Sequence, residues 1–223
     1  MTVGDHGMTL DTLPETLPIF PLAGVLLLPH GQLPLNIFEQ RYLAMVSEAR
    51  RGAPLIGMVQ PVRPQEGGGE APVVYPTGCT GRITAFEKTD DGRFLITLTG
   101  LCRFDIVEEL PLTDGGFRPV RADYQRFAAD LDEPAASQVD RKRLLLALDA
   151  FFKQQGYEAD WETVEGASNE SLITTLAMTC PFAPSEKQAL LEAMTTEDRA
   201  EIVTALMEMT VLDDTRTGEG RVQ

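Results

Sequence analysis

Along the chain, the spacing of apolar residues changes near residue 124. Before that point, short apolar runs are separated by turns rich in proline and glycine, a pattern typical of β-strands. The first clear run, residues 17–22, is predicted to be extended because a proline disfavours helical geometry in the residue before it. Pro18 and Pro21 cannot donate hydrogen bonds to a neighbouring strand. We therefore expect this strand at the edge of a sheet or beside a bulge.

The clearest strand signal is a hairpin. Residues 82–86 and 94–99 are two strand-like runs on either side of Asp91-Gly92, a dipeptide that favours a tight turn. Gly100 then interrupts the second strand, which predicts a bulge or corner before the pattern continues through residues 101–107. Many short strands with closely spaced turns favour a barrel over an open sheet.

One helix is predicted inside this first region. Between Glu39 and Arg51, apolar residues recur at helical spacing. The residues placed on one face are Tyr42, Met45, Val46 and Ala49.

After residue 124 the period becomes helical. The acidic stretch 130–134 is interpreted as a linker, and helices are predicted from a capping-box pattern at residues 137–140 to Gly156, over residues 168–179, and from residues 185 and 195 onward. The predicted fold class is α+β: a β-barrel with one helix packed on it, followed by an α-helical bundle. The predicted subdomains are residues 15–124 and 135–212, with flexible ends at 1–14 and 213–223.

Composition and charge narrow the function. Hydrophobic residues make up 43% and charged residues 24% of the 223, as in ordinary globular proteins. The net charge is 19 − 34 = −15, of which −5 falls in residues 1–123 (10 basic, 15 acidic) and −10 in residues 124–223 (9 basic, 19 acidic). Such a field repels phosphate groups, which makes nucleic acid and anionic membranes unfavourable partners. The three scattered cysteines suit a reducing compartment, and no signal peptide or membrane span is predicted, so we expect a cytoplasmic protein.

The sequence motifs that would indicate catalysis are missing. The only histidines are His6 and His30, and the chain has no zinc-binding His motif, nucleophile elbow or phosphate-binding loop. A Cys–His dyad of His30 with Cys79 or Cys102 is conceivable, but cysteines in strand patterns are more often buried structural thiols. We predict no enzyme activity, no cofactor and no metal site.

Several motifs nevertheless resemble one family. Residues 17–22 (Leu-Pro-Ile-Phe-Pro-Leu), 28–29 and 34–35 (Leu-Pro and Pro-Leu) and, above all, 37–42 (Ile-Phe-Glu-Gln-Arg-Tyr) resemble the N-terminal substrate-recognition domain of the Lon ATP-dependent protease. A second block, spread over residues 78–104, contains Gly-Cys-Thr-Gly-Arg-Ile, Asp-Gly-Arg-Phe and Leu-Thr-Gly-Leu-Cys-Arg-Phe and is similar to the same domain. The resemblance covers most of residues 15–210.

The resemblance implies a PUA-like β-barrel followed by helices, and binding of unfolded or tagged polypeptides. It does not imply proteolysis, because fold kinship does not transfer catalysis and this chain shows neither the phosphate loop of Lon's ATPase nor the Ser–Lys dyad of its protease. We therefore expect a stand-alone, non-catalytic protein. It would act as an adaptor in proteolysis or protein quality control, with a separate ATP-dependent protease as a possible partner.

The predicted polypeptide-binding segment runs from Leu26 to Pro34. Surplus apolar residues beside a proline-broken strand edge would suit an extended peptide, bound by strand addition or by patch contact. The residues proposed for this contact are Leu26, Leu27, Leu28, Pro29, Leu33 and Pro34. Phe38 and Tyr42 are instead interpreted as packing inward, while Glu39 and Arg41 cap the helix or pair with each other.

Alternative functions remain open at this stage. PUA-like barrels also bind RNA, which a ring of Lys and Arg on one face would favour. A scaffold for one dedicated protein partner is a further possibility, and a hydrolase would need a pocket with a nucleophile and a base.

Overall fold

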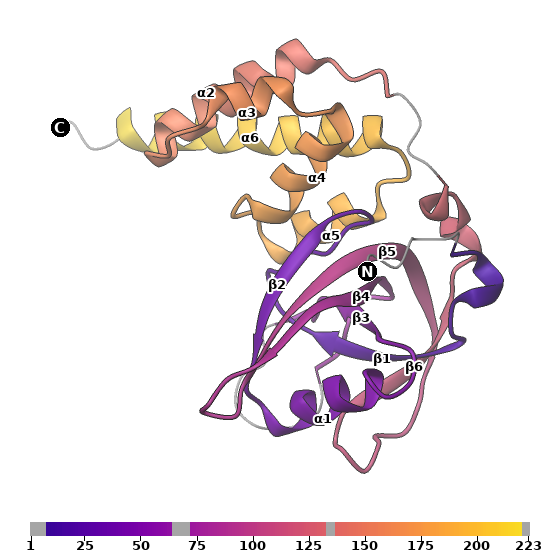
Figure 1. Ribbon diagram of the computed structural model, residues 1–223. Helices are drawn as coiled ribbons and strands as arrows, with labels where there is room; N and C mark the ends of the chain where they lie inside the picture. The colour runs from indigo at the N-terminus through magenta and orange to yellow at the C-terminus, as the bar shows by residue number, and fades with distance from the viewer. Residues whose placement is uncertain (1–7, 64–71, 133–136, 220–223) are drawn as a thin grey trace. The chain divides into compact units, whose positions relative to one another are not determined.

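The computed structural model describes residues 8–63, 72–132 and 137–219 (Figure 1). The chain forms two compact units, residues 1–134 and 135–223. Of the predicted flexible ends, residues 1–7 and 220–223 lie outside the described part of the chain. The subdomain limits and flexible ends remain predictions.

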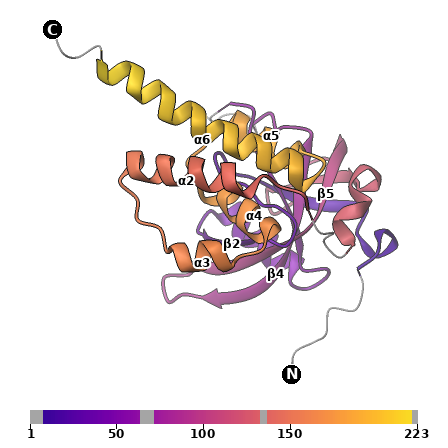
Figure 2. The same ribbon diagram turned by 90° about the horizontal axis from the view of Figure 1, so that it is seen from above.

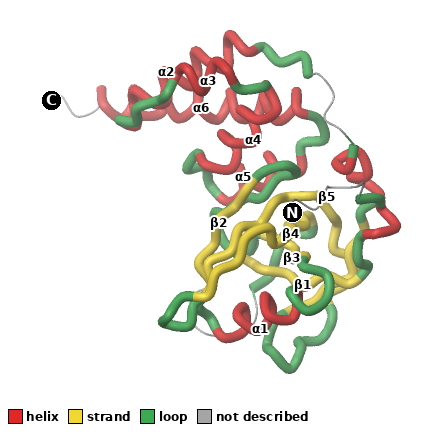
Figure 3. The backbone as a smooth tube through the Cα atoms, in the orientation of Figure 1, coloured by secondary structure: helices red, strands yellow, loops and turns green. Residues whose placement is uncertain are grey.

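The first unit is built on one mixed sheet (Figure 3). Its strands are β1 (Thr16–Pro21), β2 (Gln32–Ile37), β3 (Leu55–Val59), β4 (Thr77–Lys88), β5 (Phe94–Glu109) and β6 (Arg118–Asp123). Their order is β2-β5-β4-β3-β1-β6, and β5 also pairs with β6. Hydrogen-bonded neighbours therefore form a ring of five strands, with β2 attached to the first half of β5.

The predicted edge position of β1 is wrong, since β1 lies between β3 and β6. It pairs with β6 over Thr16–Ile19 and with β3 over Ile19–Pro21. The Leu22 N–H donates to the Val59 carbonyl of β3, so by strand alternation the Pro18 nitrogen faces β3 and the Pro21 nitrogen faces β6. Each proline nitrogen thus faces a neighbouring strand at a point where β1 does not pair with that strand. Neither proline removes a hydrogen bond between strands, so β1 can occupy an interior position.

The predicted helix is α1 (Gln40–Ala49), and its buried face is confirmed: Tyr42, Met45, Val46 and Ala49. The Tyr42 ring packs on Phe20 of β1, with ring centroids 4.2 Å apart. Glu39 and Arg41 form the expected ion pair. The inward packing predicted for Phe38 is wrong, since 64% of its surface is exposed.

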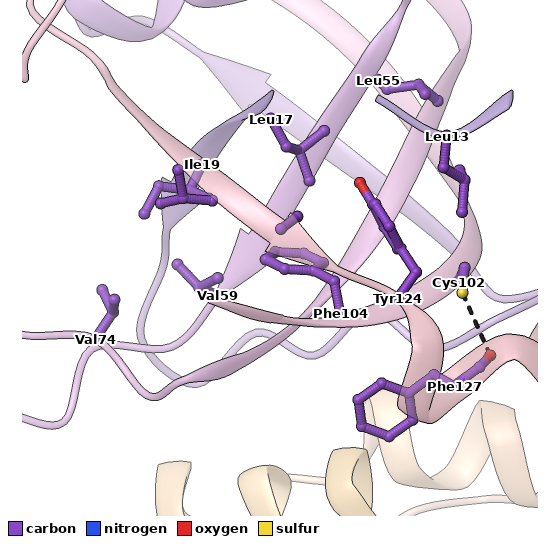
Figure 4. Packing of buried hydrophobic residues seen from close by; sticks show 12 residues of the cluster. Leu13, Leu17, Ile19, Leu55, Val59, Val74, Cys102, Phe104, Tyr124 and Phe127 are labelled. Carbon is purple, nitrogen blue, oxygen red and sulfur yellow. Dashed lines mark hydrogen bonds between the residues drawn. The ribbon is translucent and has the colours of Figure 1, made fainter. Parts of the chain in front are cut away.

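Apolar side chains, most of them from the strands, fill the inside of the ring (Figure 4). Phe104 of β5 lies at its centre, and its ring centroid is 6.1 Å from that of Tyr124. The predicted hairpin is confirmed, since Gly92 in its turn has a φ of 84°. The predicted interruption at Gly100 is confirmed by a shift in the β4–β5 register there.

A 3₁₀ segment, η2 (Gln125–Leu131), closes the first unit against β5. The Arg103 guanidinium donates to both oxygens of Asp130, at 2.8 and 2.7 Å, and the Arg103 backbone N–H donates to the same carboxylate. Arg103 also lies over the Phe127 ring. The interpretation of residues 130–134 as linker is therefore wrong at Asp130, which belongs to the folded unit.

The second unit contains five helices among its described residues (Figure 2). They are α2 (Arg141–Gln155), α3 (Trp161–Gly166), α4 (Asn169–Thr179), α5 (Pro184–Glu192) and α6 (Thr196–Glu219). The predicted stop of α2 is confirmed, because Gly156 ends it in the left-handed conformation. The α2 N-cap is Asp140, not Ser137, and the short helix α3 was not expected.

Candidate functional site

Most of the predicted binding segment lies in the interior. Leu26, Leu27 and Leu28 are at most 2% exposed, and Pro29 is also buried. The reason is a tight turn in which the Gly31 N–H donates to the Leu28 carbonyl. This turn lies directly on Gly100 of β5, where an added Cβ would come within 2.0 Å of the Leu28 carbonyl oxygen. These four side chains are not available to a peptide in this conformation.

The rest of the segment lies in β2, the outermost strand of the sheet. Leu33 is half-buried and Pro34 is exposed. The Gly100 N–H donates to the Gly31 carbonyl, so alternation turns the backbone nitrogen of Pro34 away from β5, toward the open edge. A proline at that position removes the central donor of the edge. Addition of another strand to β2 is therefore disfavoured.

A shallow groove lies on the face of β2, β5 and β4 to which Pro34 belongs. We call it the sheet groove; its volume is about 510 Å³. Its lining comes from three aligned strands: Pro34, Leu35, Asn36, Ala85, Phe86, Glu87, Leu95, Ile96 and Thr97. Pro34, Thr97 and Ala85 lie side by side across the strands, as do Asn36, Leu95 and Glu87.

The sheet groove carries little charge. Glu87 is its only ionisable lining residue, although charged residues make up 24% of the chain. Leu95 lies in the middle of the three strands and is 41% exposed. An apolar centre with few charges is the composition found at the core of protein–protein interfaces.

Strand alternation indicates that Leu95 faces outward, but it does not show that Leu95 lies in a groove. In β5 the even-numbered residues from Ile96 to Phe104 are buried, so Leu95 is an apolar residue on the outward face. Its position in a groove depends on pairing with β2, about 60 residues earlier in the chain.

The cysteines do not form a nucleophilic centre in the described residues. Cys79, Cys102 and Cys180 are all buried and free. Burial raises the pKa of Cys102 to about 12 and that of Cys180 to about 11, and it also raises the pKa of Cys79. Thiols with raised pKa values are poor nucleophiles at neutral pH.

His30 is exposed and precedes β2, with a φ of 63°. Across the described ranges, no cluster of three His, Cys, Asp or Glu residues could hold a metal ion. None of the helices described here has the length and apolar character required to cross a bilayer.

Comparison with known proteins identifies the family of the chain. The family model of the ATP-dependent protease La (Lon) substrate-binding domain matches residues 16–209. Among curated relatives, Lon protease 2 of Myxococcus xanthus is 27% identical over 198 residues, which span 88% of this chain and 24% of the relative. Lon protease of Anaeromyxobacter dehalogenans is 26% identical over 201 residues, 88% of this chain and 23% of the relative. The chain thus spans about a quarter of the length of these relatives.

Solved structures show a similar fold. A Lon N-terminal domain protein from Xanthomonas campestris superposes with a TM-score of 0.60 at 22% identity, covering 85% of this chain and 97% of that one. The N-terminal domain of Lon protease from the Mycobacterium avium complex gives a TM-score of 0.56 at 14% identity, covering 86% and 98%. Both likenesses concern the mixed α+β fold.

Proposed function

Because the chain belongs to the Lon substrate-binding domain family, we propose that it binds unfolded or degron-bearing polypeptides at the sheet groove. The observation that carries the proposal is the groove's near-absence of charge around the exposed Leu95. A surface with few charges accepts varied sequences, because it neither repels a charged segment strongly nor requires one partner charge. Its volume lies within the range of known ligand sites.

We further propose that the first unit is a PUA-like barrel, an architecture that leaves the outer face of the sheet free to bind a polypeptide. The β5–β6 pairing closes the ring that a PUA-like barrel requires. Strand β2 and the tips of β4 and β5 extend beyond that ring. A groove on this extension leaves the barrel interior to pack as a core while its outer surface binds.

The proposed role is non-catalytic. The family match covers only the substrate-binding domain, and the cysteines have the raised pKa values of structural thiols. Delivery of captured polypeptides to a separate ATP-dependent protease, as an adaptor, is the cellular role that follows from this proposal. RNA binding is less favoured because of the net charge of −15.

The test is fluorescence anisotropy of a labelled, permanently unfolded polypeptide titrated with the protein. Two competitors are added in separate titrations: the folded, native form of the same polypeptide sequence, and a single-stranded RNA. We expect saturable binding that only unfolded chains compete away. Absence of binding at high micromolar protein, or competition by RNA, would contradict the proposal.

A matched pair of variants locates the site. Leu95→Asp places a charge in the sheet groove and is expected to weaken binding about tenfold, because the charge must be desolvated when a peptide covers it. Leu112→Asp makes the same change at a residue that is 60% exposed outside the groove, and binding should be unchanged. Substitution of Leu27 or Leu28 would test only stability, because both are buried.

A further inference from the structure

The three strands of the sheet groove have two edges: β2 forms one, and part of β4 forms the opposite one. Strand β3 pairs with β4 only from Met58 opposite Cys79 to Leu55 opposite Arg82. Beyond that point β4 continues to Lys88 and pairs with β5 alone among the described strands. The remaining part of β4 has one open edge.

The hydrogen-bond pattern shows which groups this edge presents. The Thr89 N–H donates to the Arg93 carbonyl across the hairpin. Alternation from Thr89 back to the β4–β5 register shift between Ile83 and Ala85 directs the backbone groups of Ala85 and Glu87 toward β5, and those of Phe86 and Lys88 to the open edge. The open edge of β4 therefore offers two N–H donors and two carbonyl acceptors, with no proline among them, in contrast to β2.

One end of this edge is closed. The Ile83 N–H already donates to the carbonyl of Pro54, the residue just before β3. A strand added along Phe86 and Lys88 would lie in line with β3 and could not continue past Pro54. The added chain must therefore end there, at a terminus or at a sharp turn.

A positively charged side chain, that of Arg50, lies at the closed end. A small cavity of about 180 Å³ is lined there by Arg50, Pro54, Ile83, Thr84, Ala85 and Phe86. The Arg50 guanidinium lies over the Phe86 ring, with its central carbon 3.5 Å from the ring centroid. Arg50 is exposed, and no ion pair within the described ranges engages it. The ring orients the guanidinium while its donors remain accessible.

We propose that the open edge of β4 binds the C-terminal end of an extended polypeptide as an added strand, with the terminal carboxylate held by Arg50. Direction decides which terminus fits. A strand that continues the line of β3 is antiparallel to β4, so its C-terminus meets Pro54 and the cavity. A parallel strand would place its N-terminal ammonium beside Arg50, where like charges repel. Backbone pairing and carboxylate capture are both established ways for proteins to recognise peptides.

The proposal rests on the proposed function in that both ligands are unfolded chains, but it concerns a different surface. It adds a preference for free C-terminal ends to the general capture of polypeptides at the sheet groove. An internal segment of a long chain would still bind at the groove.

The experiment uses a fluorescein-labelled ten-residue peptide rich in Val and Thr, made with a free C-terminal carboxylate and as the C-terminal amide. We expect the acid to bind the whole chain about tenfold more tightly than the amide, the size expected for one exposed charge-assisted contact. Arg50→Gln should abolish this difference. Arg51→Gln removes the same charge from the next residue, and the acid–amide ratio should change less than twofold.

A third peptide tests strand addition. The acid with alternate backbone nitrogens methylated cannot donate to the edge and should bind at least tenfold more weakly, whereas methylation at the intervening positions should have little effect. Equal binding of acid and amide, or equal effects of Arg50→Gln and Arg51→Gln, would overturn the proposal.

The two proposals fail in different ways. If unfolded polypeptide binds and Leu95→Asp weakens it while acid and amide peptides bind alike, only the β4 proposal fails. If the acid binds through Arg50 but long unfolded chains do not compete at the groove, only the groove proposal fails.

Discussion

The two units differ in how they satisfy buried charge. In the first unit, the guanidinium of Arg103 is neutralised by the carboxylate of Asp130, and the two side chains are 4% and 8% exposed. In the second unit, the buried cations bind carbonyls. The Lys187 ammonium donates to the Met178 carbonyl in the last turn of α4, and Arg199 donates to the carbonyls of Leu190 and Ala193 at the end of α5.

This difference follows from secondary structure. The last carbonyls of a helix have no partner within the helix and carry partial negative charge, so a helical unit contains its own acceptors for cations. Strands use their carbonyls in pairing, so the sheet unit needs a carboxylate from another segment. That requirement places Asp130, and with it η2, on β5.

Asp130→Ala should show the largest effect, because it leaves the Arg103 charge buried without its partner. Loss of one member of a buried pair costs about 3–5 kcal/mol. Denaturant unfolding followed by hydrogen exchange in β5 measures the loss. Asp132→Ala, at an exposed carboxylate two residues away, should cost less than about 0.5 kcal/mol.

The double variant Arg103→Met/Asp130→Leu removes both charges together. It should recover most of the loss, since buried pairs are often replaceable by apolar residues. A double variant as unstable as Asp130→Ala would show that the pair acts through geometry rather than charge balance.

Alkaline pH should destabilise the first unit more than the second. Burial raises the pKa of Cys102 and of Tyr124 to about 12 each. Above pH 9 the unfolded chain loses the Cys102 proton and the folded chain keeps it, so stability falls by about 1.4 kcal/mol per pH unit. Between pH 9 and 11 this group alone removes on the order of 2–3 kcal/mol.

The second unit contains opposing effects. Burial raises the pKa of Cys180 to about 11, which also lowers stability above pH 9, but burial lowers the pKa of Lys187. That lysine loses its proton earlier in the folded state, so its contribution to stability rises as pH approaches 10.5, the ordinary value. Fluorescence of Trp161, the single tryptophan, reports on this unit, and hydrogen exchange in β5 reports on the first. Loss of the tryptophan signal at lower pH than β5 protection would contradict the comparison.

Arg199→Met should have the smallest effect. It removes the charge and leaves two helix-end carbonyls without this donor, at a cost of about 1–2 kcal/mol. Trp161 fluorescence during urea unfolding measures it. Arg143→Met provides the control, because Arg143 pairs with Glu208 at the surface and should cost less than 1 kcal/mol. A loss as large as that of Asp130→Ala would remove the distinction between the units.

Local features of the fold were predictable from the sequence. The buried face of α1, the hairpin turn at Gly92 and the stop of α2 at Gly156 all depend on residues within a few positions of one another. Helical spacing and the conformational freedom of glycine are sufficient to identify them.

Features that depend on distant partners were not predictable. Leu26–Leu28 resembled surplus surface residues because nothing nearby shows that the turn lies on Gly100, about 70 residues later. Strand β1 can lie in the interior of the sheet because each of its prolines faces a neighbouring strand outside the stretch that pairs with it. Only the strand register shows this. For the same reason, the sheet groove and the open edge of β4 could not be found from a single strand's pattern.

The anchoring of η2 has a mechanical consequence. Tension applied to the chain after residue 132 would be opposed at Asp130, whose side chain accepts three hydrogen bonds from Arg103. Arg103 lies in β5, which is hydrogen-bonded to β2, β4 and β6. The load would thus be shared across the sheet instead of peeling off its last segment, and the first unit would resist being unravelled from its C-terminal side.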